Sequence, residues 1–124
     1  WWGRQSAEAR IVLELASDVK TSVPLKLGLE KYNGYLRKWG GPNSIRVWGN
    51  GSDFDNAILA VAFKMVEMKA HNAFWQNRCY RTIKGHFPGA KAERIGTYHN
   101  ALDDARTQAA HMHELVKKHP GLLW

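Results

Sequence analysis

Apolar side chains recur at helical spacing in four stretches of the chain. Residues three and four apart share one face of a helix, and the apolar positions in these stretches follow that rule. Segments rich in glycine, proline or polar residues separate them. The pattern predicts helices over residues 6–16, 23–39, 54–68 and 101–118.

The ends of the predicted helices carry the residue types that begin and end helices. Ser6 is expected to cap the first helix, and Pro24 to lie in the first turn of the second. Gly40-Gly41-Pro42 ends that second helix. The side chains expected to face inward are Leu25, Leu27, Leu29, Tyr32, Leu36 and Trp39 in the second helix and Ile58, Leu59, Val61, Ala62, Met65 and Val66 in the third.

Two short stretches predict strands. Ile45 to Trp48 is apolar and lies between glycine-bearing turns, so we predict a buried central strand there. Cys79 to Thr82 is a weaker strand candidate, and residues 85–96 are predicted to be a loop. A strand, a glycine-bearing turn and a helix in succession predict an α/β fold. The length of 124 residues fits one domain, which we predict over residues 1–124.

Composition limits the classes of protein that need consideration. Hydrophobic residues make up 44% and charged residues 23%, which is typical of globular proteins and not of disordered ones. No apolar run approaches the roughly 18 residues that a membrane-spanning helix needs, and no secretory leader is recognisable. With Cys79 as the single cysteine, no internal disulfide can form. These features favour the reducing cytoplasm and no membrane partner.

Net charge adds a class of partner. The formal charge is +7 and the pI is near 9.8. Lysines and arginines that neutralise phosphates release counterions, so such a charge suits a nucleic-acid partner. A basic surface by itself is also found on proteins with no polyanionic partner.

Two aspartates follow the predicted central strand. The strand leads through Gly49-Asn50-Gly51 into a helix whose first turn carries Asp53 and Asp55. Ligands of open α/β sheets bind beyond the carboxyl ends of the strands, and that is where this turn is expected to lie. The structural alternative is that Ser52 or Asp53 caps the helix and Asp55 is an ordinary acid of its first turn.

A second cluster precedes and opens the last predicted helix. Ala101, Asp104, Ala105, Gln108, Met112 and Leu115 share one stripe of that helix, so Asp104 is expected to face the core and Asp103 the solvent. An inward carboxylate needs a partner, and a divalent cation is a suitable one. His99, just before the helix, could act as a general base. The alternative is an ordinary first-turn acid and a surface histidine.

Taken together, these segments resemble motifs of the DEDDh 3′→5′ exonucleases of the ribonuclease H-like superfamily. Phe54-Asp55 matches the second motif of that family, and His99 with Asp104 five residues later matches the third. Other segments resemble a phage and bacterial subgroup related to the DexA exonuclease and the mycobacterial exoribonuclease of the same type. The matching segments are Trp1-Trp2, Val47 to Gly51, Phe74-Trp75, Arg78 to Thr82 and His99 to Ala105.

The resemblance implies a fold, a reaction and a set of site residues. The fold is a three-layer ribonuclease H-like α/β domain, and the substrate is the 3′ end of single-stranded RNA or DNA. The reaction is phosphodiester hydrolysis with two Mg²⁺ or Mn²⁺ ions. Asp55 and Asp104 would hold metal, and His99 would accept a proton from water. Candidates for nucleic-acid contact are Arg78, Arg81 and Asn100.

The chain departs from the family pattern at three places. The first motif, Asp-x-Glu on an opening strand, has no counterpart here. We therefore expect a domain truncated at its N-terminal β-hairpin, inactive alone, that forms a homodimer or takes up a complementing N-terminal segment. Cys79 stands where relatives often have Asp, and Asp53 where they usually have a smaller residue.

Other functions find less support in the sequence. The six histidines lack the spacing of a zinc site, and Cys79 is expected to be a buried, unreactive thiol. Two alternatives to an exonuclease stay open. One is a non-catalytic basic domain that binds nucleic acid or serves in assembly, and the other is a helical protein-interaction module.

Overall fold

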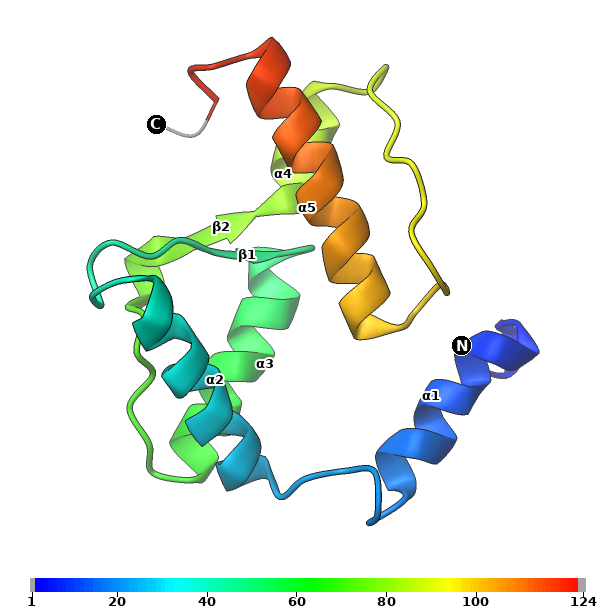
Figure 1. Ribbon diagram of the computed structural model, residues 1–124, viewed down its shortest axis with the longest axis vertical. Coiled ribbons are helices and arrows are strands. Elements are labelled where there is room, and N and C mark those ends of the chain that lie inside the picture. The colour runs from blue at the N-terminus through cyan, green and yellow to red at the C-terminus, as the bar shows by residue number, and fades with distance from the viewer. Residues whose placement is uncertain (1, 123–124) are drawn as a thin grey trace. The chain divides into compact units, whose positions relative to one another are not determined.

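A computed structural model describes residues 2–122, so Trp1, Leu123 and Trp124 lie outside the described residues. The chain divides into two compact units. One unit is Val23–His86, and the other combines Trp1–Ser22 with Phe87–Trp124. Figure 1 shows the elements of both units. The prediction of a single domain stays a prediction.

The unit Val23–His86 is mixed α/β. Its elements are α2 (Leu25–Trp39), β1 (Val47–Gly49), a π-helical turn (Ser52–Asn56), α3 (Ala57–Met65), a 3-10 turn (Phe74–Gln76), β2 (Asn77–Cys79) and α4 (Tyr80–His86). The two strands are parallel, with Val47 opposite Asn77 and Gly49 opposite Cys79. Both strands therefore end at the same edge of the sheet. The α/β class is confirmed, whereas the three-layer ribonuclease H-like arrangement stays a prediction.

Both strand predictions need correction. The first strand begins at Val47 and not at Ile45. It is not a central strand within the described residues, because it pairs with β2 alone in a two-stranded sheet, and Val47 and Trp48 are half-buried. In the second prediction only Cys79 is in a strand, because Tyr80 begins α4. Helical spacing explains this, since buried Tyr80 and half-buried Ile83 are three residues apart.

The buried stripes of α2 and α3 are narrower than the apolar pattern predicted. In α2, Leu29 and Leu36 are buried with Asn33 between them. Leu27 is exposed because it lies about 160° around the helix from Leu29. Phe63 is the buried residue of α3. The other predicted core residues that are exposed are Leu25 and Trp39, at the two ends of α2, and Ile58, Val61 and Met65, which lie on faces of α3 turned away from Phe63.

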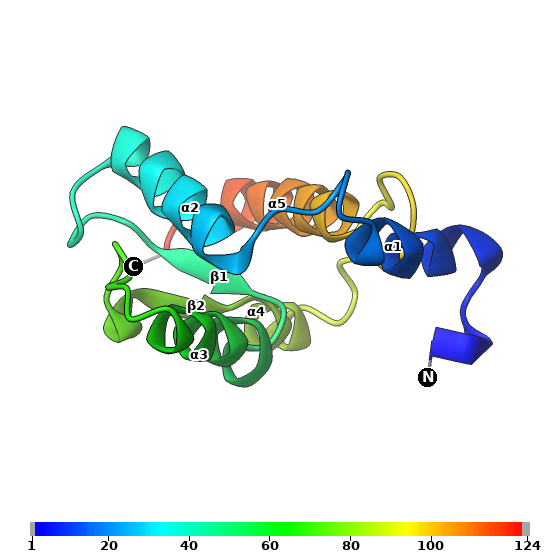
Figure 2. The same cartoon turned by 90° about the horizontal axis from the view of Figure 1, so that it is seen from below.

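Buried amides bind the loops of this unit to its helices and strands. Asn33 Nδ2 donates to the carbonyl of Lys69 at 2.9 Å, and its Oδ1 accepts from the N–H of His71 at 2.8 Å. Gln76 Nε2 donates to the carbonyl of Ile45 at 2.7 Å. These contacts give hydrogen-bond partners to three backbone groups outside the helices and strands. They fix the segment that joins the end of α3 to the start of β2 (Figure 2).

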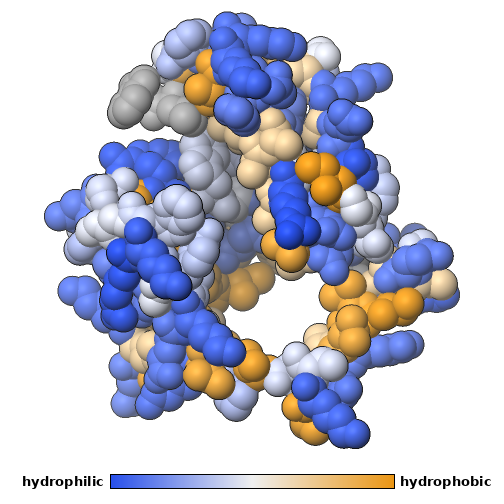
Figure 3. All heavy atoms as spheres, viewed as in Figure 1, coloured by the Kyte–Doolittle hydropathy of each residue, from blue (hydrophilic) through white to orange (hydrophobic). Residues whose placement is uncertain are grey.

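The second unit contains α1 (Ala7–Ser17) and α5 (Ala101–Lys118), with a 3-10 turn at Trp2–Arg4. The predicted cap is confirmed, because Ser6 Oγ accepts from the N–H of Ala9 at 3.2 Å. The bounds of α5 are confirmed as well. Figure 3 shows apolar residues on the surface of α1, where Ile11 and Leu15 are exposed. No helix within residues 2–122 has the length and apolar character to cross a membrane.

The buried stripe of α5 is displaced from the predicted one. Its buried residues are Thr107, His111 and Leu115. Ala101 and Ala105, which were expected to face inward, are exposed. The loop of residues 87–100 explains the displacement, because it covers the face that contains Thr107, whose hydroxyl accepts from the N–H of Ile95 at 3.0 Å. Tertiary contact, and not helical periodicity, decides which face is covered.

Candidate active site

Asp55 lies at the carboxyl end of β1. A Cβ atom added to Gly49, the last residue of that strand, would be 3.0 Å from the Asp55 Cβ and 3.2 Å from its Oδ2. The Asp55 carboxylate is exposed. The π-helical turn positions it, because the N–H groups of Phe54 and Asp55 both donate to the carbonyl of Gly51 at 3.0 Å. The carboxylate is thus available at the edge where an α/β sheet binds ligands.

Asp53 occupies a different position in the same turn. Its Oδ1 accepts from the Ser52 hydroxyl at 3.1 Å, and its side chain is exposed. The structure therefore separates the two aspartates by their contacts. Asp55 lies against the end of the strand, whereas Asp53 contacts only its neighbour Ser52 through a hydrogen bond within the described residues.

The two arginines predicted to contact nucleic acid differ in their surroundings. Arg78 Nη1 donates to the carbonyls of Trp75 and Asn77, both at 2.9 Å, so its guanidinium stabilises the backbone of residues 75–77. Arg81 is exposed, and its Cζ and Nη2 lie 3.8 Å from where a Cβ on Gly51 would be. Arg81 therefore presents a cation beside the turn that leads to Asp55, where a phosphate would be attracted.

The prediction that Cys79 is buried is wrong, whereas its lack of reactivity stays a prediction. Cys79 is half-buried at the end of β2. Hydrogen bonds from the Thr82 side chain and then from the Ser52 backbone lower the pKa of its thiol from 9.0 to about 7. A pKa near 7 means that a large fraction is thiolate at neutral pH. The predicted strand over residues 79–82 gave no sign of this, because strand alternation would put Thr82 on the opposite face from Cys79, and Ser52 is far away along the chain.

His99 and Asp104 flank the start of α5 in the other unit. Asn100 caps this helix, since its Oδ1 accepts from the N–H groups of Leu102 at 3.1 Å and Asp103 at 3.2 Å. We predicted nucleic-acid contact and not a cap for Asn100, although an asparagine before a helical pattern is a recognised cap signal. His99 has a φ of 64°, a left-handed conformation that non-glycine residues seldom adopt. Such a residue is held in place by its surroundings.

The predicted contrast between the two neighbouring aspartates is wrong, because both are half-buried. Asp103 was expected to face solvent, but its side chain is 22% exposed, compared with 33% for Asp104. Asp103 Oδ2 accepts from the N–H of Thr97 at 2.9 Å, and its carboxylate fills the space beside Gly96. The 94–99 loop thus covers Asp103. Helical geometry alone could not show where that loop runs.

Asp104 has a cationic partner that the sequence analysis missed. Arg94 Nη1 is 2.5 Å from Asp104 Oδ1. The argument that an inward carboxylate needs a counter-charge holds, but in the described structure an arginine supplies that charge. Arg94 and Asp104 are ten positions apart in the chain, with the loop before α5 between them, so no local spacing rule could have paired them.

The candidate residues fall into two groups. Asp55, Arg78 and Arg81 belong to the unit Val23–His86, whereas the segment from His99 to Asp104 belongs to the other unit. Carboxylate oxygens are the donors that Mg²⁺ and Mn²⁺ prefer, so the exposed Asp55 fits such an ion. Asp104 has Oδ1 paired with Arg94, and carboxylates that bind metal commonly accept a supporting hydrogen bond of this kind. Within residues 2–122, no group of three or more His, Cys, Asp or Glu side chains forms a metal site.

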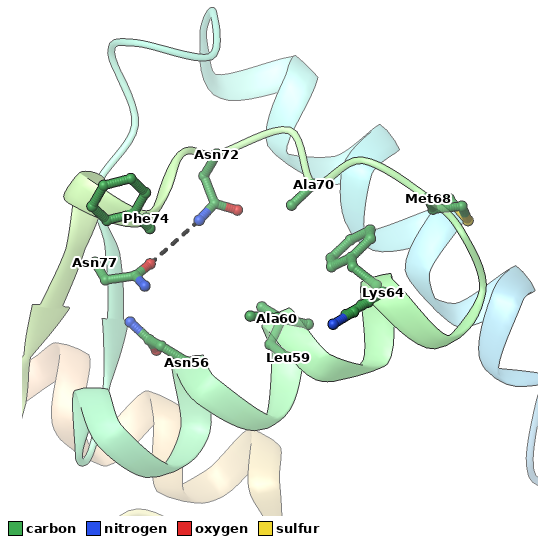
Figure 4. Close-up of a pocket in the computed structure, with 10 residues that line it drawn as sticks. Asn56, Leu59, Ala60, Lys64, Met68, Ala70, Asn72, Phe74 and Asn77 are labelled. Atoms are coloured by element: carbon green, nitrogen blue, oxygen red, sulfur yellow. Dashed lines mark hydrogen bonds between the residues drawn. The ribbon is translucent and has the colours of Figure 1, made fainter.

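One pocket lies within the unit Val23–His86 and contains none of the predicted site residues. It has a volume of about 290 Å³ and lies between α3 and the segment of residues 68–77. Figure 4 shows the amides of Asn56, Asn72 and Asn77 at one end, where Asn72 Nδ2 donates to Asn77 Oδ1 at 3.4 Å. The pocket walls are mainly apolar, with Phe63 and Phe74 among them.

Comparison with known proteins identifies the family. A family model described as the 3′-5′ exoribonuclease Rv2179c-like domain matches residues 1–116. No curated protein and no solved structure matches the chain. The family match covers nearly all of the 124 residues and includes every predicted site residue. The chain therefore belongs to the Rv2179c-like 3′-5′ exoribonuclease domain family.

Proposed function

We propose that this chain provides most of a DEDDh-type, divalent-metal-dependent 3′→5′ exonuclease that hydrolyses single-stranded nucleic acid from its 3′ end. The observation that carries the proposal is the position of Asp55, an exposed carboxylate against the last residue of β1, in a member of a 3′-5′ exoribonuclease family. Carboxylates at that edge are suited to hold metal beside a scissile phosphate. The family description favours RNA as the substrate over DNA.

Each residue receives a role from its chemistry. Asp55 and Asp104 are the proposed metal ligands. Bound divalent ions would polarise the scissile phosphate and lower the pKa of water. His99 accepts the proton of the attacking water at an imidazole nitrogen, which is suited to general-base catalysis near neutral pH. Arg81, exposed beside Gly51, attracts the phosphate backbone, and the charge of +7 strengthens binding at low salt.

The test compares three carboxylate variants of the complete gene product. Asp55→Asn and Asp104→Asn each remove a proposed ligand, and Asp53→Asn is the matched control from the same turn as Asp55. Hydrolysis of a 5′-labelled single-stranded RNA and of the matching DNA is measured with Mg²⁺ and with Mn²⁺. Loss of a supporting contact to a metal ligand already costs about 10- to 100-fold, so loss of a ligand should cost more than about 100-fold. The control should keep wild-type turnover.

Binding measurements separate hydrolysis from recognition. Both ligand variants should still bind the labelled strand, because each loses a negative charge that repels phosphate. If the gene product binds the strand but hydrolyses neither RNA nor DNA with either ion, the proposal fails. A non-catalytic nucleic-acid-binding domain would then explain the data better. Wild-type turnover in Asp104→Asn would also contradict it.

A further inference from the structure

Arg94 makes more polar contacts near the His99–Asp104 segment than its place in a loop would suggest. Its Nε donates to the carbonyl of Gly96 at 3.1 Å, and its Nη2 donates to the carbonyl of Thr97. Nη1 donates to Asp104 Oδ1 at 2.5 Å and to Thr107 Oγ1 at 3.4 Å. All three guanidinium nitrogens are therefore used, and the side chain is 20% exposed.

The face of the guanidinium is used as well. Arg94 Cζ lies 4.4 Å from the centre of the Tyr98 ring, a cation–π arrangement. The planar fork of arginine can bind carbonyls in its plane and an aromatic ring on its face at the same time. A lysine ammonium could keep the charge opposite Asp104 but could not reproduce this set of contacts.

These contacts surround the strained residue His99. Its φ of 64° persists only if the neighbouring structure fixes it. On the N-terminal side, Arg94 holds the carbonyls of Gly96 and Thr97 and the ring of Tyr98. On the C-terminal side, Asn100 is fixed as the cap of α5.

We infer that Arg94 is the positioning residue of the proposed catalytic segment: its guanidinium fixes the turn before His99 and the carboxylate of Asp104 in one arrangement. Arg94 acts through His99 and Asp104 and does not itself contact the reacting atoms. This inference rests on the proposed function for its effect on turnover. Its effect on the order of the loop is independent of any reaction.

The experiment uses Arg94→Lys, Arg94→Gln and the control Arg106→Gln in the complete gene product. Arg106 is a suitable control because it is exposed on α5, the helix that carries Asp104, and its Nη1 is 3.8 Å from Asp103 Oδ1. The first measurement is amide hydrogen exchange over residues 95–100. Protection should fall in both Arg94 variants, because Lys keeps the charge but not the carbonyl contacts, and should not change in Arg106→Gln. Helicity by circular dichroism should not change.

The second measurement is turnover on a single-stranded substrate. Misplacement of a catalytic group by about 1 Å can cost about 100-fold, so both Arg94 variants should lose at least about tenfold in kcat with KM within about twofold. Added guanidinium ion should restore part of the kcat of Arg94→Gln. If Arg94→Lys has the amide hydrogen exchange and the kcat of the wild type, the inference is overturned, since a positive charge alone would then be enough to fix the loop.

Two other outcomes are distinct. Loss of helicity in Arg94→Lys would also overturn the inference, because it would show a general structural role. If the wild-type protein hydrolyses no nucleic acid, the proposed function fails. The exchange measurement then still decides whether Arg94 orders the turn before His99.

Discussion

Replacement of Gly49 by alanine should displace the Asp55 side chain while adding or removing no charge. Gly49 is buried at the end of β1, and a Cβ atom added there would be 2.5 Å from Asn56 Oδ1. It would also be 3.0 Å from Asp55 Cβ and 3.2 Å from Asp55 Oδ2. The new methyl group would therefore push the side chains of Asp55 and Asn56 away from the end of β1.

The size of the displacement follows from these distances. Ordinary contact begins near 3.4 Å, so the amide oxygen of Asn56 must move by about 0.9 Å and Asp55 by a few tenths of an ångström. Overpacking of this kind costs about 1–3 kcal/mol in the free energy of unfolding. A catalytic group moved by a fraction of an ångström loses rate steeply, so kcat should fall about tenfold or more.

Gly41→Ala is the matched control in the same unit, because a Cβ at Gly41 would have no atom within 4 Å. The free energy of unfolding is measured by urea titration, Mn²⁺ affinity by calorimetry, and kcat on a labelled single strand. We expect Gly49→Ala to lose stability, metal affinity and kcat, and Gly41→Ala to lose none of them. Equal stability and equal kcat in the two variants would refute the placement of Asp55 against the strand end.

Two further predictions concern the loop before α5 and the thiol at the end of β2. Gly96→Ala places a methyl group against the Asp103 carboxylate at a residue whose φ is 65°. Backbone strain and a weakened hydrogen bond should together lower the free energy of unfolding, measured in urea, by about 2–3 kcal/mol. Gly89→Ala is the control, because a Cβ there has no atom within 4 Å, and its free energy of unfolding should stay within about 0.5 kcal/mol of wild type. The rate of alkylation of Cys79 by iodoacetamide should be half-maximal near pH 7, and Thr82→Val should move that midpoint toward pH 9. An unchanged midpoint in Thr82→Val would exclude the Thr82 hydrogen bond as the main cause of the lowered pKa. Because the folded pKa of Cys79 lies below the unfolded value, its contribution to stability is complete above about pH 9 and is lost as pH falls through 7.

The sequence predicted best those features that local chemistry decides. The bounds of α5 were predictable because Asn100 precedes it and Lys117, Lys118 and His119 occupy its end before Pro120. The cap at Ser6 was predictable for the same reason. The motif also predicted Asp55 in a turn after the strand, and in the structure Asp55 lies in the π-helical turn Ser52–Asn56 that follows β1.

Features that depend on distant parts of the chain were not predictable. The burial of Asp103 requires the return of the loop at Gly96 and Thr97, and the pairing of Asp104 requires Arg94. The apolar residues of α3 gave no clear inward face, because the helix is apolar on several sides and only Phe63 is buried. The lowered pKa of Cys79 depends first on Thr82, which α4 brings close where a strand was predicted, and then on Ser52, which reaches the thiol only because β2 lies beside the π-helical turn.

The π-helical turn at Ser52–Asn56 restricts how the length of this segment can change during evolution. Each residue of a helix rotates the following side chains by about 100°, so the loss or gain of one residue here would turn Asp55 away from the end of β1. The same change would rotate all of α3 and remove Phe63 from its buried position. Substitutions that keep the backbone can be absorbed at the exposed positions Asp53 and Phe54. A one-residue insertion or deletion cannot be absorbed in this way, so homologous sequences should differ in the residue types of this turn but not in its length.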